Sequence, residues 1–208
     1  MKVVIIGAGG HATVVCDALL SGSAVEVVGF VGAAEGGSRT LLGLPVFSSI
    51  DEVGDVTALS FVAAVGDNQM RRQEFERVRA LGASPVNAIH PAAILSSRCR
   101  LGSGVMAMAG AIVNVGATIG DNVILNTACS VDHHCHVGSH AHIAPGVRLA
   151  GNVTIGELAL IGAGAVILPG ITVGAGCTIG SGAVVTKDVP PGCTVVGIPA
   201  RTVPEKKS

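Results

Sequence analysis

The most regular feature of the chain is an aliphatic residue at every sixth position from Leu101 to Val185. A second apolar residue, usually a small one, follows each of these positions four residues later, from Val105 to Val189. A helix repeats its apolar face about every 3.6 residues, so a period of six predicts short strands joined by tight turns. Both apolar positions are expected to point into the coil that these strands form.

Glycine or a small polar residue often follows the repeating aliphatic residue. We interpret these glycines as residues that allow turns with unusual backbone angles. The positions most marked by glycine recur every 18 residues, so three six-residue sides make one coil. Residues 89–208 are therefore expected to form a three-sided parallel β-helix, in which each coil contacts only its neighbours. Pro190 and Pro191, which have no N–H to donate, are expected to end the coil.

Residues 1–88 show a different pattern, in which strand-like and helix-like segments alternate. The expected strands are Lys2–Ile6, Val25–Phe30, Leu59–Val65 and Pro85–Ile89, and the expected helices are His11–Leu20 and a segment from an Asn68 cap to Leu81. This alternation, with a glycine-rich first turn, predicts a small Rossmann-like α/β domain with a parallel sheet.

Composition agrees with such a coil and limits the partners. Of the 208 residues, 49% are hydrophobic, 13% are charged and 2% are aromatic, and the formal net charge is −1. A nearly neutral chain gives no indication of nucleic-acid binding. No apolar run reaches the ~18 residues of a membrane span. The N-terminus has no signal-peptide pattern, so we expect a cytoplasmic protein without a membrane partner.

The six cysteines form no Cys-x-x-Cys pair. Three of them, Cys129, Cys135 and Cys177, occupy the small inward position of the repeat, where cysteine packs as a small hydrophobic residue. We therefore expect reduced thiols rather than disulfides or a metal site.

The glycine-rich turn Gly7-Ala8-Gly9-Gly10-His11 lies between the first strand and the first helix. Such a turn presents backbone N–H groups to a phosphate. NAD is disfavoured, because the expected second strand is followed by no acidic residue until Glu35, and NAD sites use an acid there for the ribose. A sugar-nucleotide diphosphate and a purely structural tight turn are the two remaining interpretations.

Five of the seven histidines lie within ten residues of one another, all outside the inward positions. They are His133, His134, His136, His140 and His142. His136 and His140 are interpreted as solvated turn residues. His133 differs, because Gly151 lies one coil above it and leaves both open space and a free backbone N–H. A general base and an oxyanion donor acting on one carbonyl need this arrangement.

A metal site is the alternative interpretation of the histidines, since three neutral imidazoles bind zinc. Carbonic anhydrases that resemble this coil use two histidines five residues apart and a third from elsewhere. No two histidines of the cluster are five residues apart, so no metal is expected.

Taken together, the motifs resemble those of one family along essentially the whole chain. They are Gly7–Ala12, Gly66-Asp67-Asn68, His90-Pro91, Val131–Cys135, His142–Gly146 and Gly197–Ala200. The chain is similar to the hexapeptide-repeat sugar-nucleotide acetyltransferases, often labelled sialic acid O-acetyltransferase-like. The resemblance implies a left-handed coil, a homotrimer, acetyl-CoA bound along the coil between adjacent subunits, and a nucleotide sugar in the N-terminal domain.

The resemblance also implies roles for individual residues. His133 is similar to the family's general base, Gly151 to its oxyanion donor, and Asn126 to a residue near the reacting sugar. Acetyl-CoA contacts are implied at His142, Ala163 and Ser181, and nucleotide-sugar contacts at Gly9, Gly10, His11 and Gly66.

The chain departs from the family pattern in two places. The residue after the base is usually an acid that raises its basicity, and here it is His134, which as a neutral or cationic group does not do so. Asp132 is the candidate substitute, although adjacent residues on a strand point to opposite faces. The loop Val31–Ala34 lacks the acids with which relatives hold the nucleotide base, so the sequence does not identify that nucleotide.

Three functions are compatible with these features. The first is an acetyl-CoA-dependent N-acetyltransferase acting on a UDP-, dTDP- or GDP-linked 4-amino-4,6-dideoxy sugar. The second is an O-acetyltransferase acting on sialic acid or another sugar hydroxyl, which needs the same base and oxyanion donor. The third is a non-catalytic scaffold that binds a sugar nucleotide, which only the His134 departure favours. The two-domain layout favours the first.

Overall fold

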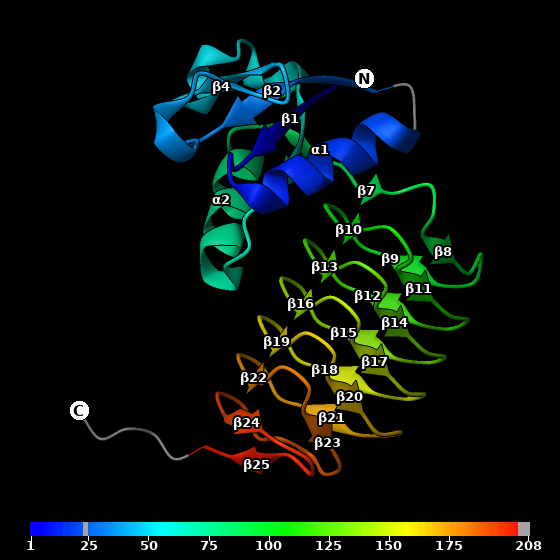
Figure 1. Ribbon diagram of the computed structural model, residues 1–208. Coiled ribbons are helices and arrows are strands. Elements are labelled where there is room, and N and C mark those ends of the chain that lie inside the picture. The colour runs from blue at the N-terminus through cyan, green and yellow to red at the C-terminus, as the bar shows by residue number, and fades with distance from the viewer. Residues whose placement is uncertain (23–24, 204–208) are drawn as a thin grey trace.

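The structure is a computed structural model that describes residues 1–22 and 25–203. Figure 1 shows a small α/β unit at one end of a stack of coils. In the part of the chain that is described, no helix is both long enough and apolar enough to cross a membrane.

The α/β unit is a six-stranded sheet in the order β3-β4-β2-β1-β5-β6, in which β3 alone runs antiparallel. Its strands are β1 (Lys2–Ile6), β2 (Glu26–Val31), β3 (Thr40–Leu41), β4 (Leu44–Phe47), β5 (Ser60–Ala63) and β6 (Ser84–Pro85). Its helices are α1 (Gly10–Gly22) and α2 (Asn68–Ala80), with 3-10 turns at Glu35–Gly37, Ile50–Glu52 and Val56–Ala58. The predicted parallel α/β fold is confirmed, and the ends of the first three predicted strands shift by at most two residues. The fourth, Pro85–Ile89, is wrong as one strand, because it divides into β6 of this sheet and Ala88–Ile89, which belongs to the coil.

Strand β1 is buried on both faces, which explains its uninterrupted apolar sequence. Val3 and Ile5 pack with the residues of α1, whereas Val4 and Ile6 pack on the other face with Phe75 of α2. The two helices therefore cover opposite faces of the sheet.

The predicted cap of the second helix is wrong by one residue. The side chain of Asp67 accepts a hydrogen bond from the Met70 N–H at 2.8 Å, so Asp67 is the N-cap and Asn68 begins α2. This leaves the Asn68 side chain free to reach the coil, where its amide donates to the Leu158 carbonyl at 2.9 Å.

The coil has three sheets, and as far as residue 185 each strand pairs in parallel with the strand 18 residues further along the chain. The first sheet contains β7 (Ala88–Ile89), β10 (Met106–Ala107), β13 (Ile124–Leu125), β16 (His142–Ile143), β19 (Leu160–Ile161), β22 (Thr178–Ile179), β24 (Thr194–Val196) and β25 (Arg201–Thr202). The second contains β8 (Ile94–Leu95), β11 (Ile112–Val113), β14 (Ser130–Val131), β17 (Arg148–Leu149), β20 (Val166–Ile167) and β23 (Val184–Val185). The third contains β9 (Arg100–Leu101), β12 (Thr118–Ile119), β15 (His136–Val137), β18 (Thr154–Ile155) and β21 (Thr172–Val173).

The repeating aliphatic and small residues fill the interior of the coil, as predicted. Both sets belong to one buried cluster that runs along the coil axis. Cys129, Cys135 and Cys177 are buried members of this cluster, and all six cysteines are free thiols. Coil pairing starts at β7, which includes Ala88, one residue before the predicted domain boundary.

The interpretation of the glycines that follow the aliphatic residues is wrong. Left-handed backbone angles occur two positions later, at every sixth residue: Gly104, Gly110, Gly116, Asn122, Ala128, His134, His140, Gly146, Asn152, Leu158, Gly164, Gly170, Gly176 and Gly182. The glycines just after the aliphatic residues are required because successive coils touch there. A Cβ atom on Gly138, for example, would lie 2.6 Å from the backbone nitrogen of Glu157 in the next coil.

The end of the coil also differs from the prediction. The two prolines end only the third sheet, where Val189 forms an isolated bridge with Val173. The first sheet continues through β24, which pairs with β22, and its outer edge is then covered by the antiparallel strand β25. A returning strand covers the edge of the coil, so its backbone groups are paired instead of exposed.

The close contact between coils at these glycines predicts how substitutions there change the free energy of unfolding. Gly138→Ala should lower the free energy of unfolding by about 1–3 kcal/mol, because backbone atoms on two coils must move apart. Gly176→Asn is the matched control, since Gly176 has a φ of 65° and open space around its Cβ position. Asn tolerates this conformation, so the free energy of unfolding of the control should stay within about 0.5 kcal/mol of the wild-type value. Urea denaturation measures both, and equal losses would contradict the contact argument.

Candidate functional site

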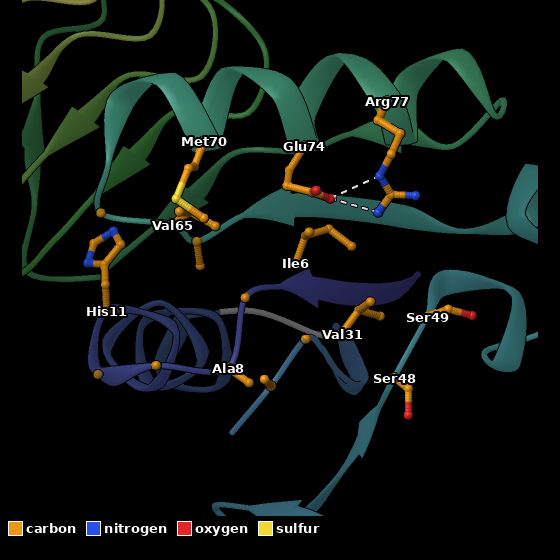
Figure 2. A pocket seen from close by; sticks show the side chains of 17 residues that line it. Ile6, Ala8, His11, Val31, Ser48, Ser49, Val65, Met70, Glu74 and Arg77 are labelled. Atoms are coloured by element: carbon orange, nitrogen blue, oxygen red, sulfur yellow. Dashed lines mark hydrogen bonds and ion pairs between the residues drawn. The ribbon is translucent and has the colours of Figure 1, made fainter. Parts of the chain in front are cut away.

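A cavity of about 800 Å³ opens at the carboxyl ends of β1, β2 and β5. Ligands of parallel α/β sheets bind at this edge. Figure 2 shows His11 on one side of the cavity, beside Met70, and Ser48 and Ser49 on the opposite side. Glu74 of α2 also lines it and pairs with Arg77 at 2.7 Å.

The glycine-rich turn lies in the wall of this cavity, at the N-terminus of α1. No protein atom lies within 4 Å of where a Cβ atom on Gly9 or Gly10 would be, so the chain itself does not require glycine there. Bare backbone facing an open cavity at a helix N-terminus is a favourable position for a phosphate. The four predicted substrate-binding residues, Gly9, Gly10, His11 and Gly66, all line this one cavity.

His11 lies at the junction of the cavity and the coil, next to His142 of β16. Their ring centroids are 6.4 Å apart, and the Asn126 amide nitrogen lies 3.2 Å from Nε2 of His142. Burial lowers the pKa of both histidines to about 4, and the positive charge of Arg71 acts in the same direction. Both imidazoles are therefore neutral at physiological pH. Nε2 of His11 is buried with no partner among the described residues.

Arg71 holds this junction together and was missed by sequence reasoning. Its side chain is fully buried, and its guanidinium donates to the carbonyls of Gly66 at 3.3 Å, Asn122 at 3.2 Å and His140 at 2.6 Å. It also donates to the Asn68 side chain at 2.7 Å. One arginine thus connects α2 and the cavity wall to two turns of the coil. In sequence it resembles any other basic residue of a polar helix, so nothing there indicates its burial.

His140 is buried, not solvated as predicted. Its exposed fraction is 5%, and its Nδ1 lies 3.0 Å from the Asn122 amide nitrogen. Its ring also packs edge-on against Phe75 of α2, with centroids 5.8 Å apart. His140 projects outward from the coil, as expected, but α2 covers this part of the coil surface. His136, by contrast, is exposed.

His133 and Gly151 meet as the 18-residue spacing predicts. A Cβ atom on Gly151 would lie 2.5 Å from Nε2 of His133, so only glycine admits the imidazole at this place. The carbonyl of His133 accepts a hydrogen bond from the Asn152 N–H at 3.0 Å, which fixes the two turns together. Within the described residues, the Gly151 N–H has no acceptor, and it is therefore available to a developing oxyanion.

Asp132 and His134 contact His133 in different ways. The Asp132 carboxylate accepts hydrogen bonds from the backbone N–H of His133 at 2.7 Å and from the Asn114 amide at 3.0 Å. It thus orders the turn and not the imidazole. His134 lies beside the ring itself, with the two Nδ1 atoms 3.1 Å apart.

The predicted site residues form two groups at different corners of the triangular coil. Asn126, Ala163 and Ser181 lie in turns that lead from the first sheet, which contains His142, to the second. His133 and Gly151 lie in turns from the second sheet to the third. A whole side of the coil separates these corners. One chain therefore presents two half-sites, of which the first adjoins the cavity through His11.

No group of three or more His, Cys, Asp or Glu side chains is placed to hold a metal ion in residues 1–22 and 25–203. The one imidazole pair at the second corner, His133 and His134, is joined by a hydrogen-bond contact between its Nδ1 atoms.

The lowered pKa values of the two buried imidazoles predict how the stability of the protein depends on pH. In the folded protein the pKa of His11 and of His142 is about 4, whereas the ordinary value is 6.5. Between these values the unfolded chain binds more protons, so stability should fall as pH decreases from about 6.5 to 4. His142→Gln should flatten this dependence, and the exposed His136→Gln should leave it unchanged. Urea midpoints over the pH range measure the effect, and identical curves for wild type and His142→Gln would contradict it.

Comparisons with known proteins agree with this geometry. A family model described as the PglD N-terminal domain matches residues 2–78, and one described as bacterial transferase hexapeptide (six repeats) matches residues 152–187. Together these matches cover parts of both the α/β unit and the coil.

Similar solved structures extend over nearly the whole chain. The acetyltransferase domain of PglB from Neisseria gonorrhoeae FA1090 is 37% identical, with 97% of this chain and 99% of that chain covered and a TM-score of 0.91. The same domain has been solved with acetyl coenzyme A. PerB from Caulobacter crescentus, solved with CoA and GDP-perosamine, is 39% identical, with 98% of each chain covered and a TM-score of 0.89. WeeI from Acinetobacter baumannii AYE is 26% identical over 98% of this chain and 100% of that chain, with a TM-score of 0.84.

These similarities confirm the predicted left-handed form of the coil and the predicted class of enzyme. The chain belongs to the family of acetyl-CoA-dependent sugar acetyltransferases that join a PglD-type N-terminal domain to a hexapeptide-repeat left-handed β-helix.

Proposed function

We propose that this enzyme transfers the acetyl group of acetyl-CoA to the amino group of a nucleotide-linked 4-amino-4,6-dideoxy sugar. The observation that carries the proposal is the placement of the His133 imidazole over Gly151, whose N–H has no acceptor among the described residues. The likeness to PerB, which is called a perosamine N-acetyltransferase and was solved with GDP-perosamine, supports an amino sugar as the acceptor.

The nucleotide sugar is proposed to bind in the α/β unit, residues 1–88, and the chemistry to take place on the coil, residues 89–208. Gly9 and Gly10 contact the diphosphate, and His11 and Gly66 line the path from the diphosphate to the coil. The buried, unpartnered Nε2 of His11 supports this assignment, because buried polar atoms normally have a partner and a bound sugar would supply one.

The reaction follows from the chemistry of the two groups. The sugar nitrogen attacks the thioester carbonyl carbon, a C–N bond forms, and the Gly151 N–H stabilises the oxyanion. Nε2 of His133 removes the proton from the nitrogen, which the attack makes acidic. When the C–S bond breaks, the imidazolium returns this proton to the thiolate of CoA.

The two half-sites are proposed to meet in a homotrimer. Ala163 and Ser181 are exposed at the first corner, and His133 is exposed at the second. A ring around a three-fold axis places the second corner of one chain against the first corner of its neighbour. Acetyl-CoA then binds between two chains, contacting His142, Ala163 and Ser181 of one of them. The six free thiols support a reducing, cytoplasmic location.

Release of the CoA thiol against a panel of acceptors tests the reaction. The panel contains UDP-, dTDP- and GDP-linked 4-amino-4,6-dideoxy sugars, sialic acid, and sugar nucleotides without the amine. Turnover should require an amino sugar nucleotide and fall by about 10²–10⁴-fold in His133→Ala. His136→Ala, an exposed histidine three residues away, is the matched control. Turnover only with hydroxyl acceptors would favour an O-acetyltransferase, and nucleotide-sugar binding without turnover would favour a scaffold.

Mixing two inactive variants tests the shared site. His133→Ala removes the base at the second corner, and Ser181→Trp should block acetyl-CoA at the first. If each site uses two chains, trimers assembled from equal amounts of both should recover about one quarter of wild-type turnover. Half of the second corners keep His133, half of the first corners keep Ser181, and an active site needs one of each. Mixtures that stay inactive, or a monomer in sedimentation, would contradict the shared site.

A further inference from the structure

His134 occupies the position where the family resemblance implies an acid, and the structure places it directly against the proposed base. The rings of His133 and His134 are nearly perpendicular, at 75°, with centroids 5.3 Å apart. Their Nδ1 atoms are 3.1 Å apart, which is a hydrogen-bond distance. One of these two nitrogens must carry the hydrogen and the other must accept it.

The backbone holds His134 in this position. Its φ is 58°, in the left-handed region that recurs at each corner of the coil. One coil below, a Cβ atom on Gly116 would lie 2.8 Å from Cδ2 of His134. The His134 N–H also donates to the Val115 carbonyl at 3.1 Å. Each imidazole of the pair therefore lies against a glycine, one in the coil above and one in the coil below.

The role of His133 determines the direction of the hydrogen bond. The Cε1–Nε2 edge of His133 faces Gly151, whereas its Nδ1 contacts His134, so Nε2 is the ring nitrogen left to take a proton. A neutral imidazole that accepts a proton at Nε2 carries its own hydrogen at Nδ1. His133 must then donate from Nδ1, and Nδ1 of neutral His134 must accept.

We propose that neutral His134 is a positioning residue that selects the reactive tautomer of His133 by accepting its Nδ1–H. This proposal rests on the proposed function of His133 as general base. An imidazole accepts this hydrogen bond only while it is unprotonated. An ionised carboxylate accepts the same bond over a much wider pH range.

Among residues 1–22 and 25–203, the His133 imidazole has no hydrogen-bond partner besides His134. Asp132, on the same turn, is the adjacent charged group, and its bonded oxygen already accepts from the His133 backbone N–H and from Asn114. The facing turns, residues 114–116 below and 150–152 above, contain no titratable side chain. Protonation of His134 therefore has two effects that act together: it removes the acceptor, and it places a positive charge beside a base that must itself become positive.

The pH dependence of kcat separates this proposal from a merely structural role. In the wild type both imidazoles must be neutral for activity. On the acidic limb, the slope of log kcat against pH should therefore be about one unit steeper than in variants whose residue 134 is not an imidazole. His134→Asn suits the positive φ and does not titrate, and His134→Glu restores an acid. Both should lower the slope of the acidic limb by about one.

The two variants should differ from one another in a further way. His134→Glu should move the acidic limb to higher pH, because its carboxylate stabilises the imidazolium form of His133. His134→Asn should lower kcat at pH 8 by about 2- to 10-fold, the effect of losing one hydrogen bond to the base. Equal slopes in the wild type and both variants would overturn the proposal.

A spectroscopic measurement tests the tautomer without using activity. In long-range 1H–15N spectra of the full chain labelled with 15N-histidine, at pH 8, His133 should carry hydrogen at Nδ1 and His134 at Nε2. Hydrogen at Nε2 of His133 would overturn the proposal. Wild-type turnover in His133→Ala would instead remove the base assignment, so the two failures are distinguishable.

Discussion

The repeat distance of 18 residues is the constraint on which the rest of the structure depends. As far as residue 185, each coil pairs with the next through backbone hydrogen bonds in an unshifted register, so side chains are stacked on the residues 18 positions away. The contact is tight enough that glycines are needed where one turn touches the next. Residues far apart in sequence, such as Asp121 and Ser139 or His133 and Gly151, meet for this reason alone.

A solenoid of this kind has no cleft of its own, because it is filled with side chains and its outer faces are flat. The cavity comes from the α/β unit, at the carboxyl edge of its parallel sheet. Arg71 makes the two parts one structure: a fully buried cation satisfied by carbonyls from the cavity wall and from the coil. Its charge, added to burial, also keeps His11 and His142 neutral at the end of the cavity.

The predicted site residues are distributed over two corners of the coil. The cavity leads to the corner that holds Asn126 and His142, whereas His133 and Gly151 lie at the next corner of the triangle. A prism with flat sides has straight edges that pack readily around a common axis. In the proposed trimer, the corner of one chain that binds the substrates meets the corner of its neighbour that carries His133. The proposed homotrimer brings two such corners together, with the proposed acetyl-CoA position between them.

The sequence by itself determined the coil, its three sides, its inward residues and the meeting of His133 with Gly151, because a strictly periodic chain leaves only one stacking. It also determined the parallel sheet and the glycine-rich turn, since their signals are local. Only the tertiary structure decided which turn position is left-handed, that β25 covers the edge of the coil, and that α2 buries Arg71 and His140. The burial of Arg71 and His140 depends on how a helix and a coil with unrelated periods pack together, and a pattern within either segment contains no information about that contact. The left-handed position and the covering strand depend on how the turns and the end of the chain pack on the neighbouring coil, which a six-residue period does not specify.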